Sequence, residues 1–226
     1  MKRKETINLT YKWHVVIQIG WIGFLMIPLF FTGCEIRELD PETGEAIILE
    51  RADRFDAARY VNDIWEGDVM QLVREEALEL EALLLELKNN PAEAQELGHR
   101  EVNQPASFLV RGTAEVVEVD TSSRVGLLRL GKTESVADFD IFLHIGPVIP
   151  GTSLRDAIPF ISVDDFTNQI EYADASRALH NRILETELAD LDVDQLEGKT
   201  LTFHGAFTFS EDRVAITPVT IEIINQ

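Results

Sequence analysis

Residues 106–130 read ASFLVRGTAEVVEVDTSSRVGLLRL, and apolar and polar residues alternate through the first half of this segment. A two-residue period places successive side chains on opposite faces of a β-strand. The residues on the apolar face would be Phe108, Val110, Gly112, Ala114 and Val116. The apolar phase then moves to Val117 and Val119, which predicts a β-bulge in a long, bent strand before a turn at 120–123.

Four more strands and one helix are predicted after this long strand. The strands are expected at 125–130, 139–145, 200–209 and 214–224, and the helix at about 174–188. Three strands, a helix and two strands follow one another in this order in the OB-fold, a small five-stranded Greek-key barrel. We therefore expect an α+β chain with an OB-like five-stranded β-barrel (β-β-β-α-β-β). A β-sandwich and an open meander are the alternatives.

Helices are predicted before the barrel, because apolar residues recur there at intervals of three and four. One apolar stripe runs through residues 55–87, and residues 89–91, Asn-Asn-Pro, end that helix and begin a short second one. The leucine-rich stripe needs an apolar partner, so we expect these helices to pack on the barrel. The sequence thus predicts a helical N-terminal region at 51–104 and the barrel domain at 105–226.

The charge of the chain is strongly uneven. Lys and Arg number 20 against 40 Asp and Glu, a net charge of −20. Residues 1–33 carry four basic residues and one acidic residue, a net charge of +3, which leaves −23 on the remainder. A basic N-terminus followed by the apolar run 15–31 is typical of an export signal. The acidic remainder argues against nucleic-acid binding, which requires a basic face.

The end of the apolar run predicts lipidation. Residues 31–34, Phe-Thr-Gly-Cys, resemble the bacterial lipobox, which has small residues at the cleavage site and a thiol that carries diacylglycerol, although Leu is usual where Phe31 stands. Cys34 is also the only cysteine of the chain. We therefore expect a lipoprotein signal peptide at 1–33, a palmitate-bearing Cys34 and a tether at 34–50. An uncleaved transmembrane helix is the alternative, and either would place the body outside the cytoplasm.

Metal and catalytic motifs are absent from the sequence. Asp190, Asp192 and Asp194 begin like a calcium-binding EF-hand loop, but the glycine and the final acid of that loop are missing. His144 and His204 fall on strands that are not neighbours in an OB-fold, so we expect singly bonded histidines rather than a metal site. No catalytic residue and no cofactor is predicted, and the chain is not expected to be an enzyme.

The connection 145–182 is the best candidate for a binding site, because polar and aromatic residues are mixed there between a barrel strand and a helix. The candidate binding residues are Arg155, Asp156, Asn168, Gln169, Glu171 and Tyr172. Amide, guanidinium and phenol groups suit hydroxyl-rich ligands through hydrogen bonds and ring stacking. The alternative is a structural loop whose polar side chains satisfy buried backbone groups.

The same connection is similar to a known family, the bacterial predicted periplasmic lipoproteins of domain of unknown function 2291. The segments that carry the resemblance are 55–58, 60–61, 64–65, 98–100, 119–124, 167–173, 198–200 and 205–207. Members of this family are often encoded beside sugar ABC transporters. The resemblance implies a lipidated cysteine at Cys34, and it implies no activity and no catalytic residue.

Three functions therefore compete. The first is a membrane-anchored accessory or binding component of a carbohydrate ABC transport system, with a sugar-binding protein, a permease or the sugar itself as its partner. The second is a periplasmic hydrolase that uses acids of the segment 155–172 on a carbohydrate, which would require two facing carboxyl groups. The third is a purely structural envelope protein, for which we would expect no pocket over that segment.

Overall fold

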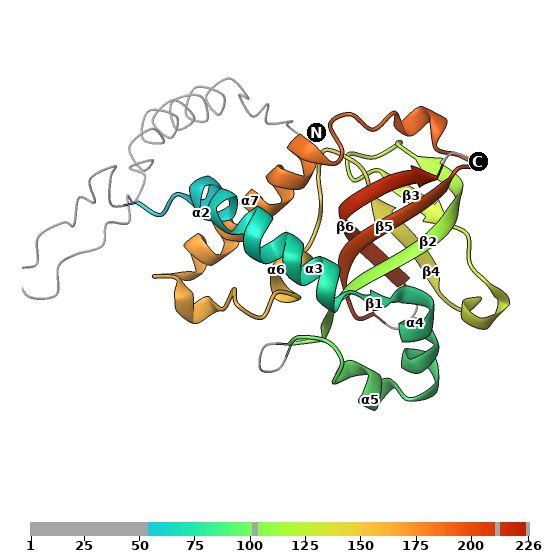
Figure 1. Cartoon of the computed structure of the whole chain (residues 1–226), viewed down its shortest axis with the longest axis horizontal. Helices are drawn as coiled ribbons and strands as arrows, with labels where there is room; N and C mark the ends of the chain where they lie inside the picture. The colour runs from blue at the N-terminus through green and yellow to red at the C-terminus, as the bar shows by residue number, and fades with distance from the viewer. Residues whose placement is uncertain (1–53, 101–103, 211–212, 225–226) are drawn as a thin grey trace, which may run out of the picture. The chain divides into compact units, whose positions relative to one another are not determined.

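Five strands form a closed barrel in the computed structural model, which describes residues 54–100, 104–210 and 213–224 (Figure 1). The barrel strands are β2 (Ser107–Asp120), β3 (Leu127–Leu130), β4 (Asp140–His144), β5 (Thr200–Thr208) and β6 (Arg213–Ile224). Strand β2 pairs with both β3 and β5, and β3 with β4; β6 closes the barrel by pairing with β4 in parallel and with β5 antiparallel. The predicted OB-like barrel is confirmed.

The predicted bulge is also present in β2. The first half of the strand pairs with β5, and the second half pairs with β3. The register shifts between Val116 and Glu118, so Val116 is buried while Val117 is 47% exposed. The extra residue bends the strand, which allows one strand to serve two neighbours around a small barrel.

The helices before the barrel differ from the single long stripe that was predicted. They are α2 (Ala57–Ile64), a π-helical turn (Trp65–Val69), α3 (Met70–Glu76), α4 (Leu80–Asn89) and α5 (Pro91–Gln95). The expectation of one helix up to residue 87 is wrong, because Ala77 is extended and β1 (Leu78–Glu79) pairs in parallel with β2. The Glu79 carboxylate also pairs with Arg111 of β2 at 2.7 Å.

Two hydrophobic cores explain this break. Leucines of α4, such as Leu84, share a core with the barrel interior. Val73 and Ala77 instead belong to a second core, in which α2, α3, α6 and α7 cover outward-facing residues of the barrel such as Leu109 (left in Figure 1). Because one apolar stripe supplies two different cores, the chain has to change direction between Ala77 and Leu80.

The connection between β4 and β5 is more ordered than the predicted loop. It contains α6 (Ser153–Asp156), α7 (Gln169–Thr186) and short 3-10 turns at Val163–Asp165 and Val193–Gln195; another 3-10 turn, Glu134–Val136, lies between β3 and β4. Helix α7 begins at Gln169 rather than near 174, since Asn168 caps its first turn. None of the helices described is both long and apolar enough to span a bilayer.

Candidate functional site

Two surface hollows meet at the turn after β4. The first, the Arg155 hollow, has a volume of about 630 Å³ and is lined by Arg100, Gln104, Pro105, Gly151, Thr152, Arg155, Asp156, Val163, Tyr172 and Thr208. The second, the His144 hollow, has a volume of about 520 Å³ and is lined by Ser123, Val125, Leu127, His144, Pro150, Gly151, Thr152, Ser153, Thr208, Ser210, Arg213 and Ala215. Because they share Gly151, Thr152 and Thr208, we treat them as one groove.

The Arg155 hollow is built around one fixed guanidinium group. Arg155 donates from Nε and Nη2 to Oδ1 of Asp156 at 2.8 and 2.6 Å, and its Cζ lies 3.6 Å from the ring centroid of Tyr172. Thr152 Oγ1 donates to Oδ2 of Asp156 at 2.5 Å, and His99 Nδ1 lies 2.7 Å from the Asp156 carbonyl oxygen. The Asp156 carboxylate is therefore already satisfied, and the hollow presents a rigid stack of guanidinium and phenol.

The structure brings together three of the six predicted binding residues. Arg155, Asp156 and Tyr172 line the Arg155 hollow. Asn168, Gln169 and Glu171 lie at the first turn of α7 and line neither hollow. Of these three, Asn168 and Gln169 are exposed, and Glu171 accepts a hydrogen bond from the Thr167 backbone at 3.0 Å.

Replacement of Asn168 by Ala is expected to cost about 1 kcal/mol of stability, the usual value of a helix N-cap. The reason is that Asn168 Oδ1 accepts hydrogen bonds from the backbone N–H groups of Ile170 at 2.9 Å and Glu171 at 3.0 Å. Urea unfolding of Asn168→Ala, with Asn168→Asp as the cap-preserving control, measures this cost. Equal stability of the Ala variant and the wild type would contradict the capping role.

The His144 hollow is rich in hydroxyl groups, and none of the lining residues that the structure describes is a carboxylate. Its hydroxyl groups come from Ser123, Thr152, Ser153, Thr208 and Ser210. Arg213 is the one charged side chain in the described part of the lining, and its guanidinium lies 4.9 Å from the ring centroid of Phe142. This hollow can therefore exchange hydrogen bonds with a polar ligand and offers one positive charge.

Two buried histidines lie near the groove. Burial, followed by the Arg213 guanidinium and then His180, lowers the pKa of His144 to about 4. Burial and the Arg155 guanidinium lower the pKa of His180 to about 4. Nδ1 of His144 and Nε2 of His180 have no hydrogen-bond partner within the described residues. Both imidazoles are therefore neutral at pH 7, and Nδ1 of His144 does not make the expected hydrogen bond to any of the described residues.

The other histidine considered for a metal site is placed differently. His204 is half-buried, and its Nδ1 lies 3.0 Å from Thr220 Oγ1. In the part of the chain that the structure describes, no three His, Cys, Asp or Glu side chains come close enough to hold a metal ion.

Sequence reasoning missed most of the groove. Its unforeseen residues include His144, Thr152, Thr208 and Arg213, which come from three strands and the turn before α6. These positions are far apart in the sequence, and no local pattern distinguishes them from ordinary strand ends and turns. Only the closure of the barrel brings them together.

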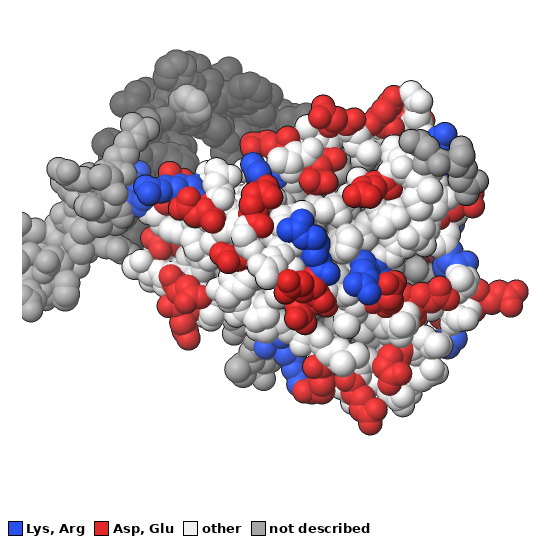
Figure 2. Space-filling model, viewed as in Figure 1, with Lys and Arg blue, Asp and Glu red and all other residues white. Residues whose placement is uncertain are grey.

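The groove also differs in charge from the rest of the surface. Acidic side chains are scattered over the face shown in Figure 2, where basic ones are fewer, in keeping with the net charge of −20. Among the described residues, the lining of the groove holds three arginines, Arg100, Arg155 and Arg213, and a single acid, Asp156. The groove is therefore a positive feature on an acidic protein.

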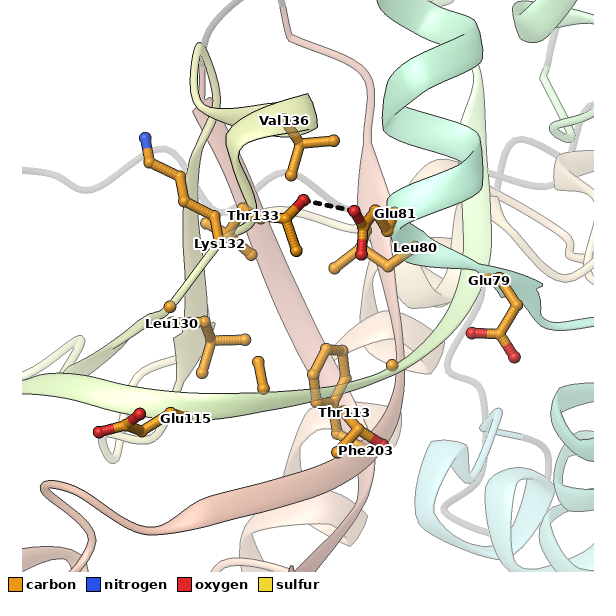
Figure 3. Close-up of a pocket in the computed structure, with 14 residues that line it drawn as sticks. Glu79, Leu80, Glu81, Thr113, Glu115, Leu130, Lys132, Thr133, Val136 and Phe203 are labelled. Carbon is orange, nitrogen blue, oxygen red and sulfur yellow. Dashed lines mark hydrogen bonds between the residues drawn. The ribbon is translucent and has the colours of Figure 1, made fainter.

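A third hollow, of about 520 Å³, lies between the start of α4 and the connection from β3 to β4 (Figure 3). Three of its four charged side chains are engaged within the protein: Glu79 pairs with Arg111, Thr133 donates to Glu81, and Lys132 donates to backbone carbonyl groups. Figure 3 shows the Lys132 ammonium pointing away from the hollow, whose apolar wall belongs to the barrel core. We therefore regard it as a packing gap between α4 and the barrel.

Comparison with known proteins gives a family and a fold. The family model described as "Predicted periplasmic lipoprotein (DUF2291)" matches residues 24–222. No curated protein sequence matches the chain significantly. The solved structures that resemble it include an OB-fold protein from Thermotoga maritima, 21% identical, with a TM-score of 0.59 over 76% of this chain and 99% of that one. At this identity the likeness concerns the fold alone.

Proposed function

Because the chain belongs to the family of predicted periplasmic lipoproteins, domain of unknown function 2291, we propose that it is the membrane-anchored accessory or binding component of a carbohydrate ABC transport system. The observation that carries this proposal is the continuous groove over Gly151 and Thr152. Its two hollows fall within the range of about 300–1,000 Å³ typical of small-molecule sites. Hydroxyl groups, a neutral imidazole and a guanidinium–phenol stack suit a hydroxyl-rich ligand.

Binding explains the groove better than hydrolysis does. Glycosidases generally place two carboxyl groups on either side of the scissile bond. The described lining of the groove contains one carboxylate, Asp156, and it is held by Arg155 and Thr152. A purely structural role would not account for a polar groove of this size. We therefore favour a sugar as the ligand of the groove and a sugar-binding protein or permease as the protein partner.

The family places the chain at the periplasmic side of a bacterial membrane through a lipid anchor. Cys34, the proposed lipid carrier, lies outside the described residues. We expect Cys34→Ser to abolish incorporation of radiolabelled palmitate and to leave the signal peptide uncleaved, because the thiol is the acceptor of the lipid. Undiminished labelling of the Ser variant would exclude Cys34 as the attachment site.

The proposed function is tested by calorimetric titration of the detergent-solubilised lipoprotein with monosaccharides and short oligosaccharides. We expect at least one of these sugars to bind, and Tyr172→Ala to weaken that binding about tenfold or more, as the loss of a stacking partner should. Phe160→Ala is the matched control, because Phe160 is an exposed aromatic residue of the same connection that lines neither hollow. Absence of binding by every sugar would contradict the proposal.

A further inference from the structure

The three arginines of the groove are not equally available to a ligand. Arg155 is committed to Asp156 and Tyr172, and Arg100 pairs with Glu96 at 2.8 Å. Arg213 is exposed and has no ion-pair partner among the residues described, and its guanidinium is held against Phe142. It is therefore the cation of the groove that can accept a ligand's negative charge.

The surroundings of Arg213 favour an anion that also carries hydroxyl groups. No carboxylate lines the His144 hollow, so an incoming anion meets no like charge from the described lining. Arginine binds a carboxylate through two parallel hydrogen bonds. The hydroxyl groups of Ser123 and Ser210 are exposed and can donate and accept, whereas Thr152, Ser153 and Thr208 already make hydrogen bonds within the protein, and Thr152 can still accept. His144 is more than nine-tenths buried at the wall of this hollow, where its neutral imidazole adds a further polar group.

From this arrangement we infer that the groove selects a carboxylated sugar, whose carboxylate is bound by Arg213 in the His144 hollow. The inference rests on the proposed function, since it names the class of carbohydrate that the groove takes. The remainder of the ligand would extend over Gly151 toward the Arg155–Tyr172 stack. Gly151 has a φ of +80° and open space beside its Cα, so the backbone there leaves room for a ligand to pass between the two hollows.

Glu211 and Asp212, which precede Arg213 in the sequence, lie outside the described residues, and we assign them no part in the proposed site. The side chains that we assign to the carboxylate and its sugar are Arg213, Thr152 and Thr208. Thr208 lies at the end of β5 in register with β2, Arg213 lies on β6 in register with β4, and Thr152 lies in the turn before α6.

The inference is tested with pairs of sugars that differ only at carbon 6. The lipoprotein in detergent is titrated with D-galacturonate against D-galactose and with D-glucuronate against D-glucose. In at least one pair we expect the acid to bind about tenfold more tightly than the neutral sugar, as one charge-assisted bidentate contact would provide. The Arg213→Gln variant should lose that preference. Arg129→Gln should keep it, because Arg129 pairs with Glu118 away from the groove.

Four results would overturn the inference, and they can be told apart. Equal affinity for the acid and its neutral partner would refute selection of a carboxylate, while the proposed binding of carbohydrate would stand. An acid preference that survives in Arg213→Gln would refute the assignment to Arg213. Competition by acetate as strong as that by the sugar acid would show a general anion site. Binding of neither sugar in either pair would refute the inference, whereas the proposed function falls only if the wider sugar panel also fails.

Discussion

Acidification from pH 7 to pH 4 is expected to lower the free energy of unfolding by roughly 3 kcal/mol for each of the two buried histidines, His144 and His180. Burial and nearby guanidinium groups lower the pKa of each imidazole to about 4, against an ordinary value of 6.5. Between these two values the unfolded chain binds protons that the folded chain does not. The contribution of these two histidines to stability is therefore constant above about pH 6.5 and decreases as the pH falls toward 4.

Urea unfolding at several pH values measures this effect. In His180→Leu one of the two buried imidazoles is absent, so we expect the loss of stability between pH 6.5 and 4 to be smaller than that of the wild type by roughly 3 kcal/mol. The comparison isolates the histidine because every carboxylate is present in both proteins. An identical pH dependence in the two proteins would show that the pKa of His180 is not lowered in the folded state.

The barrel could be predicted because its strands carry local signals. Alternation marks each strand, and the change of phase at Val117 is a direct consequence of the bulge. The break between α3 and α4 could not be predicted in this way, since Ala77, Leu78 and Leu80 continue a helical period without interruption. The helix ends there because Val73 and Ala77 pack in one hydrophobic core while Leu80 and Leu84 pack in the other. The two cores form only when the barrel has folded, so the local sequence does not indicate the break.

In the candidate site, too, some features could have been predicted from the local sequence and others could not. Asn168 was interpreted as a ligand-binding side chain, although an Asn followed three residues later by Glu171 is a known signal for a helix start. That signal would have placed the first turn of α7 correctly. The pairing of Arg155 with Tyr172 requires α6 and α7 to be in contact, and the approach of Arg213 to His144 requires β4 and β6 to be neighbours. Neither of these two contacts can be predicted from the local sequence, because each joins residues of different elements.

Replacement of Leu84 by Ala is expected to destabilise the protein by about 2–5 kcal/mol, the range for a leucine truncated in a packed core. Leu84 is fully buried on α4 and lies in the same core as barrel residues such as Phe203. Truncation removes apolar contacts and leaves a cavity between the helix and the barrel interior. Urea unfolding at pH 7 gives the free energy directly.

The neighbouring Leu85 supplies a matched control, since it is on the same helix and is 41% exposed. Leu85→Ala should cost well under about 1 kcal/mol, because little buried surface is lost and Ala is a favourable helix residue. A large difference between the two variants would show that α4 belongs to the barrel core and is not a loosely attached extension. If both variants lowered the free energy of unfolding only slightly, α4 would not be part of the barrel core. The barrel would then be stable without the packing of this helix.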